Sequence, residues 1–454
     1  MPSITYYSVA ANNIRAKGKR MKLAKLHLLN YRRFESFDID FHPELTVIAA
    51  RNGQGKTTVL DAIAAALGPF VGAFDMGKSE NIKRTDARYS AVGKGFENEQ
   101  NFPVIIDAWM SSSEIQWRRA LNSPKGRTTT KEAAPLANWG KELQANIRTE
   151  THINLPIISY YPSSRLWVNH REASGKAVIS GSRSLGYEDC LTSSSSFRQM
   201  QRWLKDATGS AQQEKEFKGY EQSNLKPRLD GIQNAVNQAM KEEGWSEFHY
   251  SFAHRELVMW HSDHGLLPVS LLSDGVRAMI SLVADIAFRC ARLNGHLQDQ
   301  APVLTQGIVI IDEVDLHLHP GWQQRVVSSL RNAFPSIQFI VSTHSPQVLS
   351  SVHKENIRII GRNTEGQFIA ETPTVKSYGE ISSDILETIM LVDPYPPIAE
   401  RKDLNRLTEL VDQGDYKKPE AKSLFNDLTA TLGENHPALI RLQRSIQRQE
   451  VLKK

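Results

Sequence analysis

Hydrophobic and polar residues alternate along the first part of the chain and then change to a helical period. Residues 23–29 and 34–41 alternate as half-buried strands do, and residues 45–49 form a short apolar run typical of a buried strand. From Val59 onward apolar residues recur at helical spacing. This order predicts three strands and then a helix, with a glycine-rich turn between the third strand and the helix.

The middle of the chain predicts further strands and one helical insertion. Strands are expected at residues 155–161, 248–260, 308–311 and 338–341, the last strand of the chain, and a hairpin at residues 103–121. The Pro/Thr/Lys-rich residues 122–138 predict an exposed loop. Within residues 197–245 an apolar stripe follows 4-3-4-4 spacing, at Leu225, Leu229, Ile232, Val236 and Met240. The stripe is too short for a long coiled-coil arm.

Composition places the chain among globular proteins. It has 454 residues, 40% of them hydrophobic and 23% charged, which is close to the globular average. No apolar run approaches the roughly 20 residues that a membrane span needs, so we expect no membrane association. Two cysteines cannot form a disulfide framework. The N-terminus lacks the apolar core of a secretory signal, and we therefore expect a cytoplasmic protein.

Charge is spread unevenly along the chain. The net charge is +5, and residues 1–34 contain eight Lys or Arg and no acid. A solvated basic tail is favoured over a dedicated nucleic-acid-binding arm for this run, because the run contains few aromatic residues. The Lys and Arg residues of the helical insertion, interspersed with glutamates, leave both readings open. Contact with DNA or RNA is therefore an expectation that rests on electrostatics alone.

We expect five segments. Residues 1–20 would be a basic tail, residues 21–196 and 246–375 the two parts of one α/β lobe, and residues 197–245 the helical insertion. Residues 376–454 are helical and charged and would form a C-terminal extension for partner docking. Its apolar positions at Ile381, Ile385, Leu386 and Ile389, and again at Leu404, Leu407, Leu410 and Val411, must be covered by a partner or by the chain itself.

The strongest local signal is the glycine-rich turn of residues 50–57, Ala-Arg-Asn-Gly-Gln-Gly-Lys-Thr. It follows a short apolar strand and opens a helix, where backbone N–H groups can surround a phosphate. Lys56 would supply charge to the β and γ phosphates, and Thr57 a hydroxyl to Mg²⁺. The predicted ATP-binding residues are Asn52, Gly53, Gln54, Gly55, Lys56, Thr57 and Thr58.

Two further segments place polar residues directly after buried strands. Asp312 and Glu313 follow the apolar run of residues 308–311; Asp312 would hold Mg²⁺, and Glu313 would polarise the attacking water. His344 follows the strand at residues 338–341 and can bond a γ-phosphate oxygen. Carboxyl ends of neighbouring parallel strands are where ligands bind in open α/β sheets.

A fourth element, residues 271–277, opens the apolar helix of residues 278–291. The turn contains Ser273, Asp274, Gly275 and Arg277, and a helix N-terminus of this kind can bind an anion. An ordinary N-cap by Ser273 or Asp274 would have the same sequence. The order of the four elements along the chain favours the anion site.

Together these elements resemble the Walker A, signature, Walker B, D-loop and switch histidine of SMC/RecF-like ABC ATPases. The D-loop residue of this set is Asp315. The resemblance implies an α/β fold, an ABC-type P-loop ATPase with two lobes, a short helical insertion and a helical C-terminal extension. It implies ATP and Mg²⁺ as ligands, and head-to-tail dimers in which the signature completes the partner's site. Ala50 and Asp274 replace the usual glycines, so hydrolysis could be slow or gated. No Q-loop glutamine can be assigned.

A narrower resemblance connects the chain to PtuA-type ATPases of Septu and retron anti-phage systems. It rests on residues 155–167, 185–197, 271–277, 313–320 and 433–437. Membership implies an HNH nuclease partner, PtuB, and in retrons a reverse transcriptase carrying multicopy single-stranded DNA (msDNA). The function expected is an ATP-binding and ATP-hydrolysing regulatory subunit that controls that nuclease.

Three alternatives were compared with this expectation. A RecF-like DNA repair clamp remains open, although it gives the C-terminal extension no role. A transporter nucleotide-binding domain is disfavoured because about 220 residues separate Lys56 from Ser273. An ATPase with its own Toprim nuclease needs a DxD motif after the last strand, and none is present.

Overall fold

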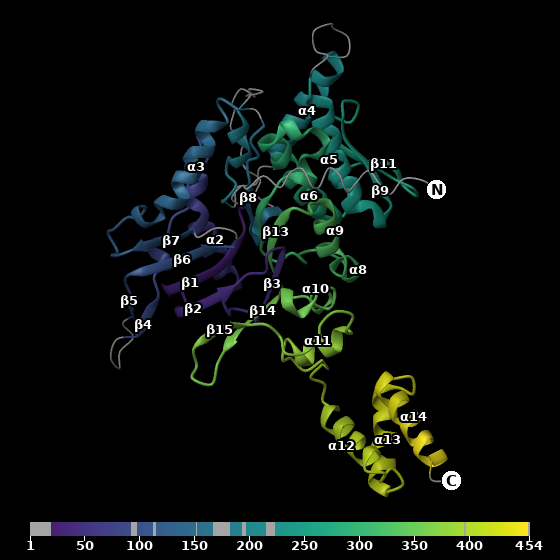
Figure 1. The fold of residues 1–454 in the computed structure, drawn as a ribbon. Helices are drawn as coiled ribbons and strands as arrows, with labels where there is room; N and C mark the ends of the chain where they lie inside the picture. Colours follow the sequence, from purple (N-terminus) through teal and green to yellow (C-terminus); the bar gives the residue numbers. More distant parts are fainter. Residues whose placement is uncertain are drawn as a thin grey trace. The chain divides into compact units, whose positions relative to one another are not determined.

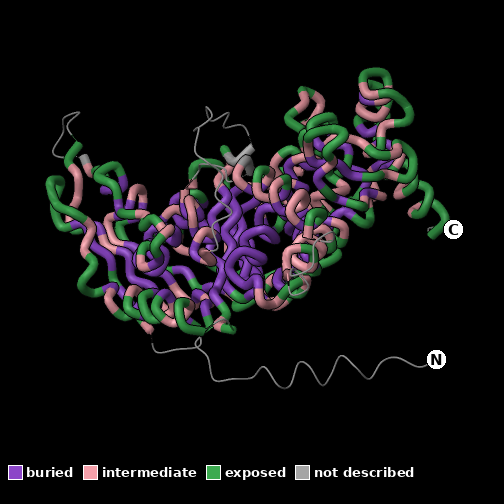
Figure 2. The backbone as a smooth tube through the Cα atoms, turned by 90° about the horizontal axis from the view of Figure 1, so that it is seen from above, coloured by how far each residue is buried: buried purple, intermediate pink, exposed green. Residues whose placement is uncertain are grey.

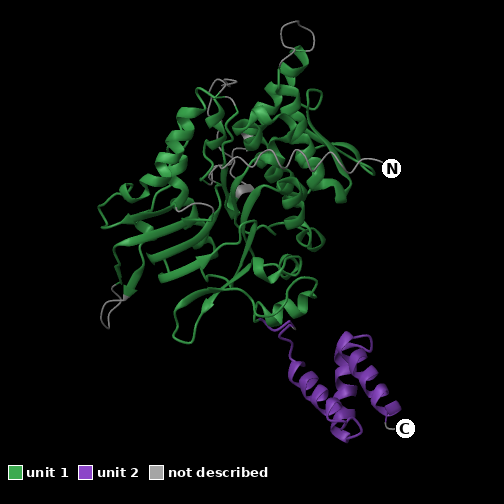
Figure 3. Cartoon of the chain, in the orientation of Figure 1, with its two compact units in different colours: residues 1–391 green, residues 392–454 purple. Residues whose placement is uncertain are grey.

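The computed structural model describes residues 20–91, 98–111, 115–150, 152–166, 182–192, 197–214, 223–394 and 396–452. The expected basic tail therefore lies outside the described residues, apart from Arg20. The chain divides into two compact units, Met1–Leu391 and Val392–Lys454 (Figures 1 and 3). None of the described helices combines the length and the apolar character needed to cross a membrane.

A six-stranded sheet forms the centre of the main unit. Its strand order is β15-β14-β3-β13-β12-β8, and all strands are parallel except β15. The strands are β3 (Leu45–Ala49), β8 (Ile157–Tyr161), β12 (Gly307–Ile311), β13 (Ile337–Thr343), β14 (Ile357–Arg362) and β15 (Phe368–Glu371). Every residue of β3, β8, β12 and β13 is buried, as expected for parallel strands covered on both faces (Figure 2).

A second, antiparallel sheet has the order β2-β1-β6-β7. Its strands are β1 (Leu23–Tyr31), β2 (Phe34–Asp40), β6 (Val104–Met110) and β7 (Gln116–Leu121). The long helix α2 (Lys56–Val71) packs against it, and the indole Nε1 of Trp117 donates to the carbonyl of Ala66 at 2.8 Å. Helix α3 (Ala134–Asn146) lies beside α2, and a short ribbon joins β4 (Tyr89–Ala91) to β5 (Asn98–Gln100).

The predicted helical insertion consists of α4 (Phe197–Glu214) and α5 (Leu225–Met240), and it is packed into the main unit. In the apolar stripe of α5, Ile232, Val236 and Met240 are buried, and the helix lies against α6 (Asp274–Leu293). A three-stranded sheet, β11-β10-β9, follows, made of β9 (Trp245–Ser251), β10 (Glu256–His261) and β11 (Gly265–Pro268). Short helices complete the unit: α7 (Ala301–Leu304), α8 (Pro320–Gln323), α9 (Val326–Ala333), α10 (Pro346–Ser350) and α11 (Ser382–Thr388).

The second unit contains α12 (Arg401–Asp412), α13 (Pro419–Leu432) and α14 (Pro437–Leu452). These helices bury an apolar core of their own, to which Leu404, Leu407, Leu410 and Val411 contribute. The second apolar stripe predicted in the extension is therefore covered inside this unit.

Three expectations differ from the structure. The strand at residues 338–341 is not the last, because β14 and β15 follow it and complete the central sheet. The segment 122–138 is not entirely a loop, because α3 begins at Ala134 with a proline in its first turn, where proline is tolerated. Residues 376–391 belong to the main unit, where Ile385 and Ile389 are buried in its core. The docking role proposed for residues 376–454 stays a prediction.

Candidate functional site

The phosphate loop lies between the end of β3 and the start of α2. Gly53 and Gly55 have φ angles of 71° and 103°, which an L side chain rarely adopts. A Cβ at Gly55 would also lie 2.5 Å from the Phe34 ring, so both the backbone and the space require glycine there. Ala50, in contrast, does not have a positive φ, so alanine fits where the Walker A pattern usually has glycine.

Lys56, the first residue of α2, is buried and points back into the loop. Its ammonium donates to the carbonyl of Ala50 at 3.2 Å and lies 2.5 Å from Nε2 of His344. The two residues are 288 positions apart in sequence. They meet because β3 and β13 are adjacent parallel strands whose carboxyl ends lie at the same edge of the sheet.

Burial lowers the pKa of both Lys56 and His344. For Lys56 the desolvation effect is the largest, and the nearby carboxylates of Asp312, Glu313 and Asp315 oppose it. For His344 burial is again the largest cause, and the positive charge of Lys56 lowers the pKa further. The lowered pKa of His344 favours the neutral imidazole, which can accept a hydrogen bond from Lys56.

Thr57 and Asp312 form the next pair. The Thr57 hydroxyl donates to Oδ2 of Asp312 at 2.8 Å, and the Ser342 hydroxyl donates to Oδ1 of the same carboxylate at 2.5 Å. Ser342 also accepts from the backbone N–H of Glu313 at 2.8 Å. One serine thus fixes both acidic residues at the end of β12. Ser342 lies two residues before His344 in the sequence, but its role could not be predicted there, because it depends on the pairing of β12 with β13.

Glu313 and Asp315 follow in the turn after β12. Glu313 has a φ of 49°, a left-handed conformation that is uncommon outside glycine and that concentrates at functional sites. The Thr343 hydroxyl donates to Oδ1 of Asp315 at 2.6 Å. The turn after β12 is therefore bonded to the end of β13 at successive positions.

The signature segment faces a separate cavity of about 490 Å³. Ser273, Asp274 and Gly275 line it together with His317 and His319 from the turn after β12, and the β9–β10 hairpin supplies another wall. A Cβ at Gly275 would lie 2.5 Å from the carbonyl oxygen of His317. Only glycine at this position therefore lets the start of α6 pack so closely against that turn. No phosphate-loop residue lines this cavity in the described chain.

The unusual carboxylate of the signature has a partner within its own helix. Arg277 donates through Nη2 to Oδ1 of Asp274 at 2.6 Å. Ser273 is the N-cap residue of α6 but makes no side-chain capping bond. The ion pair offsets the negative charge that Asp274 would otherwise present to an anion.

Three polar contacts beside the site were not predicted. Asp61, on α2 one turn beyond Thr57, accepts from the Tyr160 hydroxyl at 2.8 Å and from Arg32 at 2.7 Å. Arg51, in the phosphate loop, donates to the carbonyl of Leu391 at 2.5 Å. Asp61 lies four residues after Thr57 on the same helix, and this spacing could have indicated that it lies near the site. The contact between Arg51 and Leu391 spans 340 residues, and no sequence pattern indicated it.

The predicted ATP-binding set is thus contiguous with the acids and the histidine. Within this set, Asn52 is exposed, Gln54 is half-buried and Thr58 is buried. Of the predicted signature residues, Ser273, Asp274 and Gly275 line the other cavity, whereas Arg277 does not. The structure therefore gathers two groups of predicted residues, and the roles assigned to them stay predictions.

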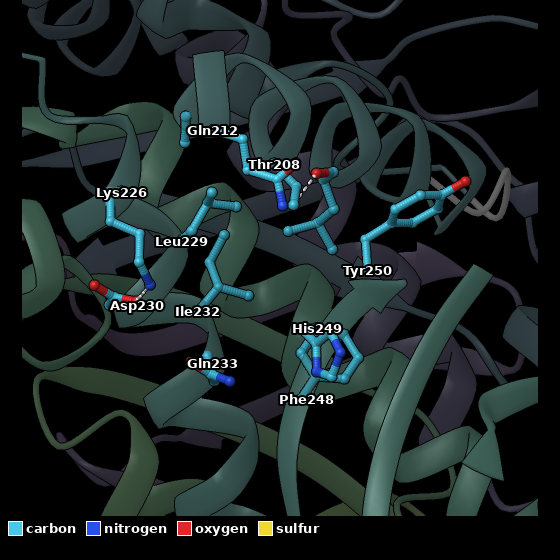
Figure 4. A pocket seen from close by; sticks show the side chains of 12 residues that line it. Thr208, Gln212, Lys226, Leu229, Asp230, Ile232, Gln233, Phe248, His249 and Tyr250 are labelled. Carbon is cyan, nitrogen blue, oxygen red and sulfur yellow. Dashed lines mark hydrogen bonds and ion pairs between the residues drawn. The ribbon is translucent and has the colours of Figure 1, made fainter. Parts of the chain in front are cut away.

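Another pocket, of about 200 Å³, lies in the helical insertion (Figure 4). Its walls come from α4, α5 and β9 and include Leu204, Leu229, Ile232, Phe248 and Tyr250. Lys226 and Asp230 on its rim pair with each other. This pocket contains none of the residues predicted to bind phosphate, so it does not compete with the strand ends as the nucleotide site.

Comparisons with known proteins match this chain to AAA domains and to probable ATPases. A protein family described as an AAA domain matches residues 25–243. A second, described as "AAA domain, putative AbiEii toxin, Type IV TA system", matches residues 141–350. Retron Ec83 probable ATPase from Escherichia coli is 26% identical over 95% of this chain and 88% of its own length. Retron Vc95 probable ATPase from Vibrio cholerae is 26% identical over 81% of this chain and 78% of its own length.

A Septu protein PtuA from Bacillus mycoides is 23% identical over 93% of this chain. Over most of its length the chain is therefore similar to retron ATPases and to a Septu PtuA protein. It spans 53% of the length of that Bacillus mycoides relative. Among solved structures, the SMC head domain from Thermotoga maritima aligns with 78% of this chain and 100% of its own chain, at 16% identity and a TM-score of 0.41.

Proposed function

We propose that this ATPase is an ATP-binding and ATP-hydrolysing regulatory subunit of an anti-phage defence complex. The observation that carries the proposal is the junction of Lys56, Thr57, Asp312 and His344 at one sheet edge. Relatives named as retron ATPases and as Septu PtuA support the biological setting. The effector would be a partner HNH nuclease like PtuB. In a retron setting, a reverse transcriptase and its msDNA would join the complex.

The donor set at the strand ends fits Mg²⁺. The Thr57 hydroxyl and the Asp312 carboxylate oxygen are 2.8 Å apart. Adjacent ligands of an octahedral Mg²⁺ at about 2.1 Å are separated by roughly 3 Å, so both oxygens can bind one ion with little movement. No group of three or more His, Cys, Asp or Glu side chains in the described part of the chain is arranged for a metal, as expected if phosphates and water supply the other ligands. Bound there, Mg²⁺ would neutralise phosphate charge.

The chain's own residues would divide the work of hydrolysis. Backbone N–H groups of residues 52–56 bind the phosphates, and Lys56 exchanges its contact with His344 for a charged phosphate oxygen. Glu313 orients and polarises the attacking water. His344, released from Lys56, can donate to the γ-phosphate once it carries the proton on the nitrogen that faces it.

The active unit would be a head-to-tail dimer. The signature cavity is separate from the phosphate loop of the same chain, which supports completion of each nucleotide site by the partner's Ser273 and Gly275. Because Arg277 pairs with Asp274, the carboxylate would weaken phosphate binding by the signature but would not abolish it.

Mixing two inactive variants tests this arrangement. Lys56→Ala subunits lack the phosphate contact, and Ser273→Arg subunits block the signature. Each alone should lose more than about nine-tenths of ATP turnover, because each interaction contributes to the transition state. A mixture should regain up to about a quarter of wild-type turnover, because mixed dimers contain one intact composite site. A mixture as inactive as its components would refute the composite site.

A RecF-like clamp remains the second candidate on one observation. RecF from Lactococcus lactis is 46% identical to this chain, but over only 43 residues, or 10% of the chain. A DNA-dependent ATPase that needs no protein partner would favour the clamp. Co-purification with a nuclease, and nuclease activity that changes with ATP, would favour the regulatory subunit.

A further inference from the structure

In the C-terminal unit, helix α14 carries exposed arginines without exposed acids beside them. Along α14 the exposed positions between residues 441 and 448 are all arginine or glutamine: Arg441, Gln443, Arg444, Gln447 and Arg448. The exposed positions of α12 and α13 mix acids with bases. A face without any acid is unusual in a unit whose other helices are balanced.

The three arginines form one stripe. Arg441, Arg444 and Arg448 have i, i+3, i+7 spacing, which brings their side chains to the same side of a helix. They span about 10 Å along the axis, a length over which one duplex strand presents roughly three phosphates. The one acid of α14, Glu450, lies roughly 160° around the axis from Arg448 and does not neutralise the stripe.

The other two arginines of this unit, Arg401 and Arg406, form ion pairs, and so does Lys418. Arg406 of α12 donates to Glu420 of α13 at 2.8 Å, and Lys418 donates to Asp415 at 2.7 Å. In contrast, Arg444 and Arg448 make no ion pair with any residue that the structure describes. Arg441 uses its Nε only for the backbone carbonyl of Pro437. The stripe is therefore a set of guanidinium groups whose charge remains available.

We propose that this face of α14 binds the phosphate backbone of a nucleic acid. Guanidinium groups bind phosphate oxygens in pairs of hydrogen bonds, and three of them along one side of a helix can contact successive phosphates. A protein partner would need apolar residues at the centre of the contact, and the exposed positions from 441 to 448 provide none. Nucleic-acid interfaces are more polar and more positive, which matches this face.

The test uses the full chain with all three arginines changed to glutamine, Arg441→Gln, Arg444→Gln and Arg448→Gln. Fluorescence anisotropy would follow the binding of a 20-nucleotide single strand, the matching duplex and an RNA of the same sequence, between 50 and 250 mM NaCl. Each phosphate contact contributes about 0.7 to 0.9 to the slope of log K against log salt. The slope should therefore become shallower by about two to three, with affinity at low salt falling at least tenfold.

Two controls make the outcome specific. Arg406→Gln removes an exposed arginine of the same unit that is already paired, and it should leave the slope unchanged. Replacement of the three arginines by lysine keeps the charge and should retain most of the salt dependence. Circular dichroism spectra and ATP affinity should stay as in the wild type for all variants, because the changed side chains are exposed and are not among the residues predicted to bind ATP.

An unchanged slope in the triple variant would overturn the proposal. So would unchanged nucleic-acid affinity together with lost co-purification of a protein partner, because that result assigns the stripe to an acidic protein. The three probes identify which nucleic acid is bound, and equal loss on all three would indicate recognition of the backbone alone.

Discussion

At the residue scale, the contact between Lys56 and His344 is the feature from which the chemistry of the site follows. The ammonium cannot lie 2.5 Å from the imidazole nitrogen and also bind a phosphate fully. Nucleotide entry must therefore break or lengthen this contact. The histidine would report the presence of the γ-phosphate through that exchange.

The roles of the acid and the lysine can be separated by two substitutions. Lys56→Ala should abolish ATP binding, because the buried charge at the loop is lost. Glu313→Gln should leave ATP affinity within a few-fold of wild type and reduce turnover by about 10²- to 10⁴-fold, since only polarisation of the water is removed. It should also trap the closed dimer. Equilibrium binding, single-turnover hydrolysis and size-exclusion chromatography with ATP measure these effects, and wild-type turnover by Glu313→Gln would contradict the assignment.

The lowered pKa of His344 predicts a pH dependence of stability. In the unfolded chain a histidine titrates near pH 6.5, whereas burial and Lys56 hold the pKa of His344 below that value in the folded chain. Below about pH 6.5 the unfolded state therefore binds the extra proton, and the free energy of unfolding should fall as pH falls.

Thermal unfolding without nucleotide between pH 7.5 and 5 would measure this effect. His344→Gln keeps an acceptor for Lys56 but does not titrate, so its loss of Tm on acidification should be smaller than that of the wild type. Some loss should remain, because burial also lowers the pKa of His296 to about 4. Parallel curves for the two proteins would exclude His344 as a contributor.

At the element scale, a buried ion pair ties the signature helix to the strand beside the Walker B strand. Arg289 of α6 donates to Asp285 at 2.9 Å and to the carbonyl of Gly186 at 2.8 Å, and the Tyr161 hydroxyl of β8 donates to Asp285 at 2.7 Å. The side chains of Asp285 and Arg289 are only 5% and 4% exposed. Movement of α6 is therefore coupled to the end of β8.

Arg289→Met should destabilise the main unit by about 3–5 kcal/mol, because it leaves the Asp285 carboxylate buried without its cation. The double variant Asp285→Leu/Arg289→Met should be less destabilised, since it removes both charges. Urea unfolding followed by tryptophan fluorescence would measure both, with the exposed pair variant Arg406→Gln as a control that changes little. If the double variant is less stable than Arg289→Met, Asp285 and Arg289 contribute more to the free energy of unfolding than the neutralisation of each other's charge.

At the scale of the whole molecule, the boundary between the units decides how the C-terminal extension can be tested. Ile385 and Ile389 are 0% and 2% exposed, in the core of the main unit, and the carbonyl of Leu391 is held by Arg51 of the phosphate loop. A chain ending near residue 375 would therefore expose the ATPase core. A chain ending at Leu391 removes only the unit that has its own core.

The chain ending at Leu391 should be soluble, bind ATP with near wild-type affinity and lose co-purification with a partner nuclease. The chain ending at residue 375 should lose several degrees in Tm or become insoluble, because the apolar surface that Ile385 and Ile389 cover becomes exposed to water. Differential scanning fluorimetry and nucleotide titration compare the two. If the chain ending at Leu391 is insoluble, the C-terminal unit stabilises the ATPase. If that chain still co-purifies with the nuclease, the docking surface lies elsewhere.

Local sequence determined the phosphate loop, the buried strands and the acids that follow them. Gly53, Gly55 and Lys56 function through backbone conformation and spacing within one turn, and fully apolar runs such as residues 308–311 can only be buried. Strands β14 and β15, at one side of the central sheet, were missed because their half-exposed residues give a weak pattern.

Only the tertiary structure decided which of these pieces meet. Pairing of β3 with β13 and of β13 with β12 brings Lys56 to His344 and Ser342 to Asp312, across separations of 288 and 30 residues. The same holds for the amphipathic helices after residue 376. Their apolar stripes predict burial but not against what, because any apolar surface satisfies the hydrophobic effect. The fold assigns the first stripe to the main core and the second to the C-terminal unit.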